Sequence, residues 1–86
     1  MINSHHQFQK FDYLKAGADI IDQTDPNNIY MGYAKQGHTD PATAGWNILL
    51  INTAAGIITF KWANGQFNFA ATWDNRAAET YAYKNF

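Results

Sequence analysis

Two segments of alternating apolar residues flank a short turn-forming stretch, and this pattern constrains the fold more than any other feature of the chain. Residues 46–50 and 58–62 each carry an apolar side chain at every second position, and residues 52–56 between them end in a glycine. Apolar side chains at every second position line one face of a β-strand. The pattern therefore predicts a β-hairpin. Its alternating side chains are Trp46, Ile48, Leu50, Ile58, Phe60 and Trp62.

The predicted hairpin should have one buried face and one face that is partly exposed. Lys61 points away from the side that carries Trp62, which marks the Trp62 side as buried. On the first strand, Leu49 and Ile51 share a side with Asn47, so the outer side of that strand is half apolar. We expect this outer side to be a contact surface, with Leu49 and Ile51 as contact residues.

Two shorter strands are expected upstream of the hairpin. Residues 25–28 read Asp-Pro-Asn-Asn, a dense turn signal. Before this turn, residues 20–21 would form a short strand, and after it residues 29–34 alternate well enough for another. Gly32 inside the second strand suggests a bulge or a close approach of another segment. Residues 36–45 hold two glycines and a proline, so we expect them to form a loop.

The C-terminal part of the chain is expected to hold a turn, a helix and a closing strand. Residues 63–65, Ala-Asn-Gly, are typical of a tight turn that needs positive φ angles. Apolar residues then recur every fourth position from residue 69 to residue 81, which predicts a short helix over residues 69–80 with Asn68 as its cap. Residues 81–83 are a candidate closing strand. The predicted fold class is mainly β, a small antiparallel sheet, sandwich or partial barrel, with one short C-terminal helix.

Residues 1–17 differ from the rest of the chain and are treated as a separate segment. Residues 1–9 are polar apart from scattered apolar side chains, and Phe11 and Tyr13 would share one side of a strand. Such a segment is an edge strand or an arm that packs against a neighbouring molecule, with the edge strand slightly favoured. We therefore expect an N-terminal arm or edge strand over residues 1–17 and a single small β-rich domain over residues 18–86.

The composition indicates a surface that is partly covered by another molecule. Only 15% of the 86 residues are charged, whereas 47% are hydrophobic and 16% are aromatic. Soluble domains are typically about 25% charged. The covering molecule would be a second copy, a larger assembly or a ligand. The net charge of −1 provides no electrostatic basis for binding nucleic acid or anionic lipid.

No residue pattern in the chain indicates a reaction centre, a metal site or a cofactor site. The only serine is Ser4, and the adjacent pair His5-His6 lacks the spacing that places two imidazoles on one face. An Asp-x-x-Asp-x-x-Asp stretch over residues 19–25 lacks the glycine and terminal glutamate of a calcium loop and is interpreted as a solvated turn. The chain has no cysteine, so disulfide and thiolate chemistry are excluded. Catalytic, metal and cofactor residues are accordingly expected to be none.

Arg76 and the three tryptophans each have two interpretations. Arg76, the only arginine, would anchor a carboxylate on a partner, or it would form an internal ion pair with Asp74 or Glu79, which is the favoured reading. The tryptophans would form a platform for stacking on sugar rings, or they would pack in the core. Their spacing along the predicted elements favours the core.

A resemblance to a known group rests on two short motifs and a tyrosine in the C-terminal half. The motifs are Trp62-Ala63-Asn64-Gly65 and Trp73-Asp74-Asn75-Arg76-Ala77, and the tyrosine is Tyr81. They are similar to a pattern carried by small uncharacterised proteins of tailed bacteriophages. An upstream motif, Tyr30-Met31-Gly32-Tyr33-Ala34, extends the similarity to residues 29–83.

The resemblance implies a virion component that is encoded among head and tail genes, and it implies no enzymatic activity. The predicted function is a bacteriophage structural protein, a homo-oligomer that decorates or stabilises the capsid, the neck as a head–tail connector, or the tail. Its partners would be other copies of itself and other virion proteins, with no nucleic acid and no membrane, and its location would be the virion, assembled in the host cytoplasm. The alternative is a carbohydrate-binding or host-surface-binding module on the virion. The residues predicted to make contacts are Phe8, Phe11, Tyr13, Leu49, Ile51 and Arg76.

Overall fold

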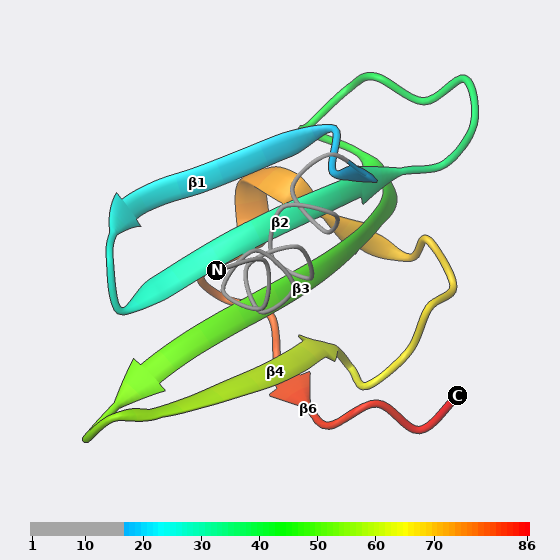
Figure 1. The fold of residues 1–86 in the computed structure, drawn as a ribbon. Coiled ribbons are helices and arrows are strands. Elements are labelled where there is room, and N and C mark those ends of the chain that lie inside the picture. The colour runs from blue at the N-terminus through cyan, green and yellow to red at the C-terminus, as the bar shows by residue number, and fades with distance from the viewer. Residues whose placement is uncertain (1–16) are drawn as a thin grey trace, which may run out of the picture.

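A computed structural model describes residues 17–86 as a single antiparallel β-sheet (Figure 1). Within this range the sheet has six strands, in the order β1-β2-β3-β4-β6, and β5 pairs with the start of β3. The predicted arm or edge strand of residues 1–17 lies outside the described residues, except for Gly17. The elements are β1 Ile20–Asp25, β2 Asn28–Ala34, β3 Ala44–Ala54, β4 Ile57–Ala63, β5 Ala71–Thr72, the 3₁₀ helix η1 Trp73–Asn75, and β6 Tyr81–Ala82.

The turn between β1 and β2 forms where Asp-Pro-Asn-Asn predicted it. The Asp25 carboxylate accepts hydrogen bonds from the Asn27 N–H at 2.9 Å and from Asn28 Nδ2 at 3.0 Å. Asp side chains commonly stabilise a reversal in this way, by bonding main-chain groups two residues on. The short strand predicted at Ile20 and Ile21 is therefore confirmed and extends as far as Asp25.

The predicted hairpin is confirmed as β3 and β4, and β3 is the central strand of the sheet. Along its length β3 pairs with β2, and on its other side it pairs first with β5 and then with β4. The turn is shorter than expected, since only Ala55 and Gly56 connect the strands, with φ angles of 53° and 80°. Two consecutive positive φ angles match the twist of the flanking strands.

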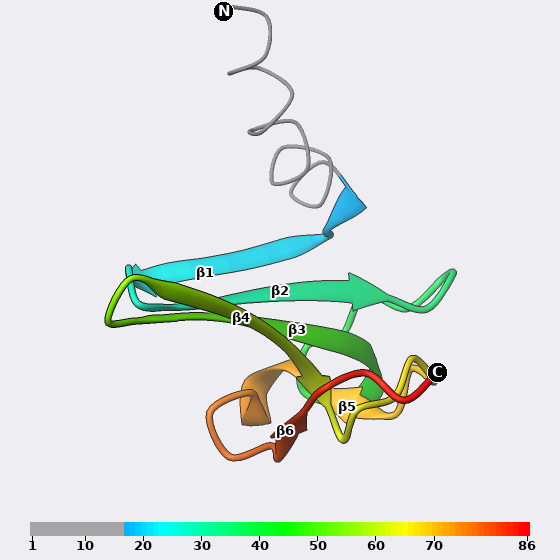
Figure 2. The same ribbon diagram turned by 60° about the horizontal axis from the view of Figure 1, so that its bottom comes forward.

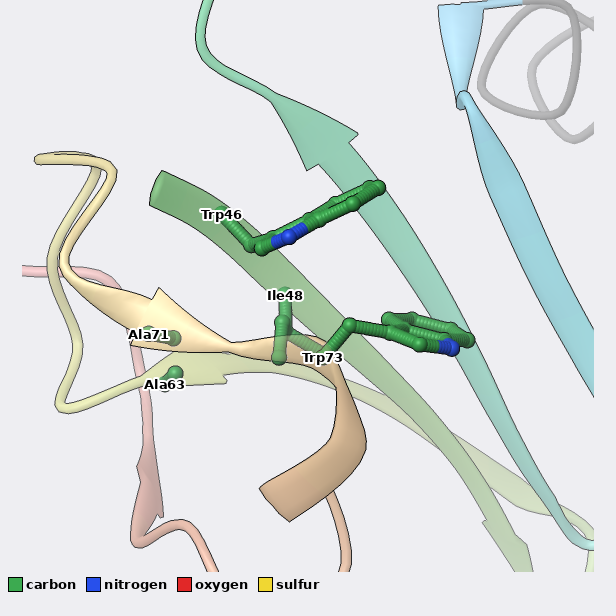
Figure 3. Close-up of a cluster of buried hydrophobic side chains, with 5 residues drawn as sticks. All are labelled: Trp46, Ile48, Ala63, Ala71 and Trp73. Atoms are coloured by element: carbon green, nitrogen blue, oxygen red, sulfur yellow. The ribbon is translucent and has the colours of Figure 1, made fainter. Parts of the chain in front are cut away.

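One face of the sheet, called the inner face here, packs against the chain from β5 to β6. Figure 2 shows β5, η1 and β6 on one side of the strands β1 to β4. Trp46 and Ile48 of β3 meet Trp73 of η1 there, and the two indole rings are 6.0 Å apart (Figure 3). The buried cluster on this face consists of Trp46, Ile48, Ala63, Ala71 and Trp73. Burial of these large side chains is the main source of stability on this side of the sheet.

Gly32 allows Trp73 to approach the sheet closely, as a glycine inside a strand predicted. A Cβ atom at this position would lie 2.7 Å from Ile20 Cγ2 and 2.7 Å from Trp73 Cε3. Those distances are shorter than van der Waals contact, so only a residue without a side chain fits between the β1 side chain and the indole ring.

The prediction of a buried side and a partly exposed contact side on the hairpin is wrong, because Leu49, Ile51 and Trp62 share one face. Pairing across the two-residue turn places Leu49 opposite Trp62 and Ile51 opposite Phe60 on what we call the outer face. Leu49 and Ile51 are only 1% and 3% exposed there, whereas Ile58 is 46% exposed. The turn length sets the register, and a change of one residue in register moves every side chain to the other face.

The predicted C-terminal helix over residues 69–80 is absent, and that segment holds only β5, the single turn of η1 and irregular chain. Phe69 has a φ angle of 54° and its N–H donates to Asn47 Oδ1 at 2.8 Å, so the chain is not helical where the helix should begin. Ala71 then pairs with Trp46 of β3 in an extended conformation. Tertiary pairing outweighs the helical propensity of the alanines. The candidate closing strand is confirmed as β6.

Candidate interaction surface

Among the residues that the structure describes, the contact residues predicted from the sequence do not form one surface. Phe8, Phe11 and Tyr13 lie outside the described residues. Leu49 and Ile51 are side by side on the outer face, but both are buried. Buried side chains pack within the chain, so neither residue presents the apolar surface that the sequence suggested.

Arg76 is held entirely by groups of its own chain. Its Nε donates to Asp22 Oδ2 at 3.0 Å, and its Nη1 donates to the Trp73 carbonyl at 3.1 Å. The guanidinium carbon lies 4.6 Å from the centroid of the Trp73 ring, within the range of a cation–π contact. The internal ion pair is therefore confirmed, but its partner is Asp22 on β1 and not Asp74 or Glu79 as predicted.

Hydrogen bonds hold Asp22 in its ionised form. The bonds from the side chain and the N–H of Thr24 are the largest causes, followed by the bond from Arg76, and together they lower the pKa of Asp22 to about 2. A carboxylate that accepts several hydrogen bonds favours its charged form. Tyr81 also contacts Arg76, since its hydroxyl donates to the Arg76 carbonyl at 2.8 Å. Burial raises the pKa of that hydroxyl.

The tryptophans do not form a platform for sugar rings. Trp46 and Trp73 are each 4% exposed, which confirms core packing for both. Trp62 on the outer face is partly buried, and its ring makes T-shaped contacts with Phe67 and Phe86 at centroid distances of 5.4 Å and 5.8 Å. A ring that stacks on a pyranose needs an open face, and neither Trp46 nor Trp73 has one.

The carboxylates of the acidic residues between positions 19 and 25 accept hydrogen bonds from main-chain N–H groups. Asp19 Oδ2 accepts from the Ala34 N–H at 2.8 Å, and Asp22 Oδ1 accepts from the Thr24 N–H at 2.9 Å. Within residues 17–86 no group of three potential metal ligands comes together. No helix in this range is long and apolar enough to cross a membrane.

A hollow of about 330 Å³ lies beside β1 and the loop before β3, and its polar groups are occupied by local contacts. His38 Nε2 lies 2.9 Å from the Asp40 carbonyl, and its ring meets the Trp46 ring edge-on at 6.0 Å. Trp46 Nε1 donates to the same carbonyl at 3.1 Å. These contacts fix the loop, and they leave the hollow without a convergent set of polar groups aimed at a ligand.

Large exposed apolar side chains gather at β4 and the C-terminal segment. Ile57 is 66% exposed and Ile58 is 46% exposed at the start of β4. Phe67 and Phe86 are 46% and 61% exposed, and with Trp62 they form a cluster of rings in T-shaped and tilted contact. Exposed apolar groups in such number mark surfaces for protein association. The exposure of Ile58 was not predicted from the sequence, because the alternating pattern placed the Ile58 side in the core.

The two long edges of the sheet differ in how they are protected. The β1 edge carries Asp22 and Asp25, and Pro26 follows it. Charged residues and proline are common means by which proteins prevent a sheet edge from pairing with another chain. The edge formed by Ile57, Ile58 and Thr59, called the β4 edge here, carries no charge. Among the described residues β6 lies beside β4 only at Trp62 and Ala63.

Comparisons of this chain with protein-family models, with curated proteins and with solved structures found no match.

Proposed function

We propose that this protein is a non-enzymatic structural protein of a bacteriophage virion, a small subunit that associates with copies of itself and with other virion proteins on the capsid, neck or tail. The observation that carries the proposal is the exposed apolar surface of β4, where Ile57 and Ile58 lie on an edge without charge. A subunit held by many neighbours needs such surfaces, and repeated weak contacts give it avidity without a single strong site.

The contacts of the charged side chains on the inner face support a structural role for the motifs shared with the phage proteins. Arg76 and Asp22 satisfy each other, and Trp73 fills the core between them and β3. The motif from Trp73 to Ala77 therefore stabilises the fold. A catalytic or binding site would instead present its polar groups to a cavity. The assignment to a virion rests on the resemblance of these motifs to those of small phage proteins.

Light scattering of the full-length protein tests the proposed association. The expected result is a defined oligomer whose mass is a multiple of the 9.7 kDa chain. A monomer over the whole accessible concentration range would contradict the proposal.

Binding of glycans tests the carbohydrate-binding alternative, and the structure determines which variant can be used. Trp46→Ala is unsuitable, because Trp46 is 4% exposed and its removal would damage the core. A glycan array probed with the intact protein is expected to show no binding. Specific binding by a monomeric protein would replace the structural role with the carbohydrate-binding one.

A further inference from the structure

The main-chain groups of Ile58 point away from the sheet. Ala55 and Gly56 form a two-residue turn, and the residues that flank such a turn, Ala54 and Ile57, exchange main-chain hydrogen bonds. Because bonded and non-bonded pairs alternate along an antiparallel ladder, Ile57 and Thr59 bond to β3. The N–H and C=O of Ile58 therefore face outward along the β4 edge.

We propose that the β4 edge pairs with the same edge of a second copy, in an antiparallel arrangement about a two-fold axis at Ile58. This inference rests on the proposed function in that it names the mode of self-association. A two-fold axis perpendicular to the sheet keeps the inner and outer faces of both copies on the same sides. The two Ile58 residues then exchange two main-chain hydrogen bonds, and the sheets of the two copies become continuous.

The side chains at this edge are complementary to themselves. Ile58 packs against the partner's Ile58 on the outer face, and Ile57 lies opposite the partner's Thr59 on the inner face. Apolar and β-branched cross-strand pairs of this kind stabilise antiparallel sheets. Lys61 lies beyond the pairing, so no like charges face each other directly. The edge therefore fits a second copy without an additional partner.

The C-terminal segment selects this register over its neighbour. β6 lies beside Trp62 and Ala63, and Lys61 Nζ is 5.0 Å from the centroid of the Tyr83 ring. A two-fold axis at Thr59 would place the partner's Ile57 opposite Lys61, where Tyr83 already lies. An axis at Ile58 places the partner's Ile57 opposite Thr59, so the partner's β4 does not reach that position and only its turn residues Gly56 and Ala55 lie level with Phe60 and Lys61.

Cysteine cross-linking tests the register, and the full-length protein suits it because the natural chain has no cysteine. Directly opposed, hydrogen-bonded residues have Cα atoms about 5.5 Å apart, within the range of about 4.4–6.8 Å that a disulfide spans. Under mild oxidation, Ile58→Cys should become a covalent dimer. Gln23→Cys on the charged β1 edge and Thr59→Cys next to the axis are the matched controls and should remain largely uncross-linked. Equal cross-linking of all three variants, or none at residue 58, would overturn the proposal.

Light scattering of Ile58→Lys provides an independent test that does not depend on disulfide formation. Two lysines at the axis would repel each other, so the mass of the oligomer should fall by a factor of two, while Gln23→Lys should leave it unchanged. Ile58 is 46% exposed, and unchanged circular dichroism would verify that the variant remains folded. An Ile58→Lys oligomer of unchanged mass would overturn the edge pairing and leave the proposed function standing. A monomeric wild type would count against both.

Discussion

The guanidinium of Arg76 donates to the carboxylate of Asp22 across a sequence separation of 54 residues, with an Nε–Oδ2 distance of 3.0 Å. This contact ties the segment after β5 to the first strand of the sheet. Both side chains are partly buried, with 28% of Arg76 and 21% of Asp22 exposed. The ion pair therefore joins β1 to the segment that packs on the inner face, and Trp73 packs beside it.

Stability should fall in acid through the protonation of Asp22. The pKa of Asp22 is lowered from 3.8 to about 2 in the folded protein, by hydrogen bonds from Thr24 first and from Arg76 next. A carboxyl group whose pKa is lowered on folding stabilises the protein above its unfolded pKa and loses that contribution as the pH falls through the folded value. The contribution of Asp22 should thus decline between pH 3.8 and about pH 2.

Urea unfolding of the wild type and Asp22→Asn across this pH range measures the effect. The wild type should be the more stable protein at neutral pH, and the two unfolding midpoints should converge as the pH approaches about 2. Midpoints that stay equally far apart at every pH would show that Asp22 does not titrate as its contacts indicate. The comparison subtracts the contributions of the other carboxylates, which both proteins share.

Gly32→Ala should destabilise the protein by about 1–3 kcal/mol, the usual effect of adding a methyl group to a packed core. The new Cβ would lie 2.7 Å from Trp73 Cε3 and from Ile20 Cγ2, so the indole ring must shift. Gly17→Ala is the matched control, because its Cβ would meet nothing closer than Tyr33 Cε2 at 3.9 Å. Thermal unfolding should show a lower midpoint for Gly32→Ala alone. Equal midpoints for the two variants would mean that Trp73 does not approach the sheet so closely.

The successes and the failure of sequence analysis in the C-terminal half have different physical causes. The hairpin was predictable because apolar alternation and a glycine-containing turn act locally. The helix over residues 69–80 was not, because Phe69, Trp73 and Tyr81 are separated by multiples of four residues for three unrelated reasons. Trp73 fills the inner face, Tyr81 lies in β6, and the N–H of Phe69 bonds to a buried side chain 22 residues away. Spacing within one segment contains no information about such distant partners.

The exposure of β4 was not predicted because the sequence left the register of the hairpin open. The sequence between residues 52 and 56 permits several turn lengths, and the one that forms leaves only Ala55 and Gly56 unpaired. That choice puts Leu49 and Ile51 on the same side as Ile58. Central strands bury both faces, whereas the outermost strand leaves large side chains exposed, and a single sequence does not reveal which strand is outermost.

Asn47→Ala should lower stability by about 1–3 kcal/mol, because it leaves a partly buried main-chain group without its partner. Asn47 is 2% exposed, and its Oδ1 accepts the Phe69 N–H at 2.8 Å. Hydrogen exchange locates the effect: the Phe69 amide should exchange faster in the variant, while the Asn64 amide, which donates to the Thr80 carbonyl, should change less. Unchanged protection of Phe69 would refute the role given to Asn47 in holding this loop.

Trp73→Ala should destabilise the protein far more than Trp62→Ala. Removal of a buried tryptophan typically costs about 3–5 kcal/mol, and Trp73 is 4% exposed in the inner cluster. Trp62 is only partly buried on the outer face, so its removal leaves a smaller cavity. Denaturant midpoints should therefore rank wild type, Trp62→Ala and Trp73→Ala in decreasing order. The reverse order would place the main core on the outer face.

Quantitative mass spectrometry of purified phage particles tests the central claim, that this protein is a structural subunit of a virion, most directly. The claim predicts that the protein co-purifies with intact particles at a fixed copy number. Hundreds of copies per particle would indicate capsid decoration, and between six and a few tens would indicate the neck or tail, according to the symmetry of repeated subunits. Absence of the protein from particles whose other structural proteins are all recovered would contradict the claim.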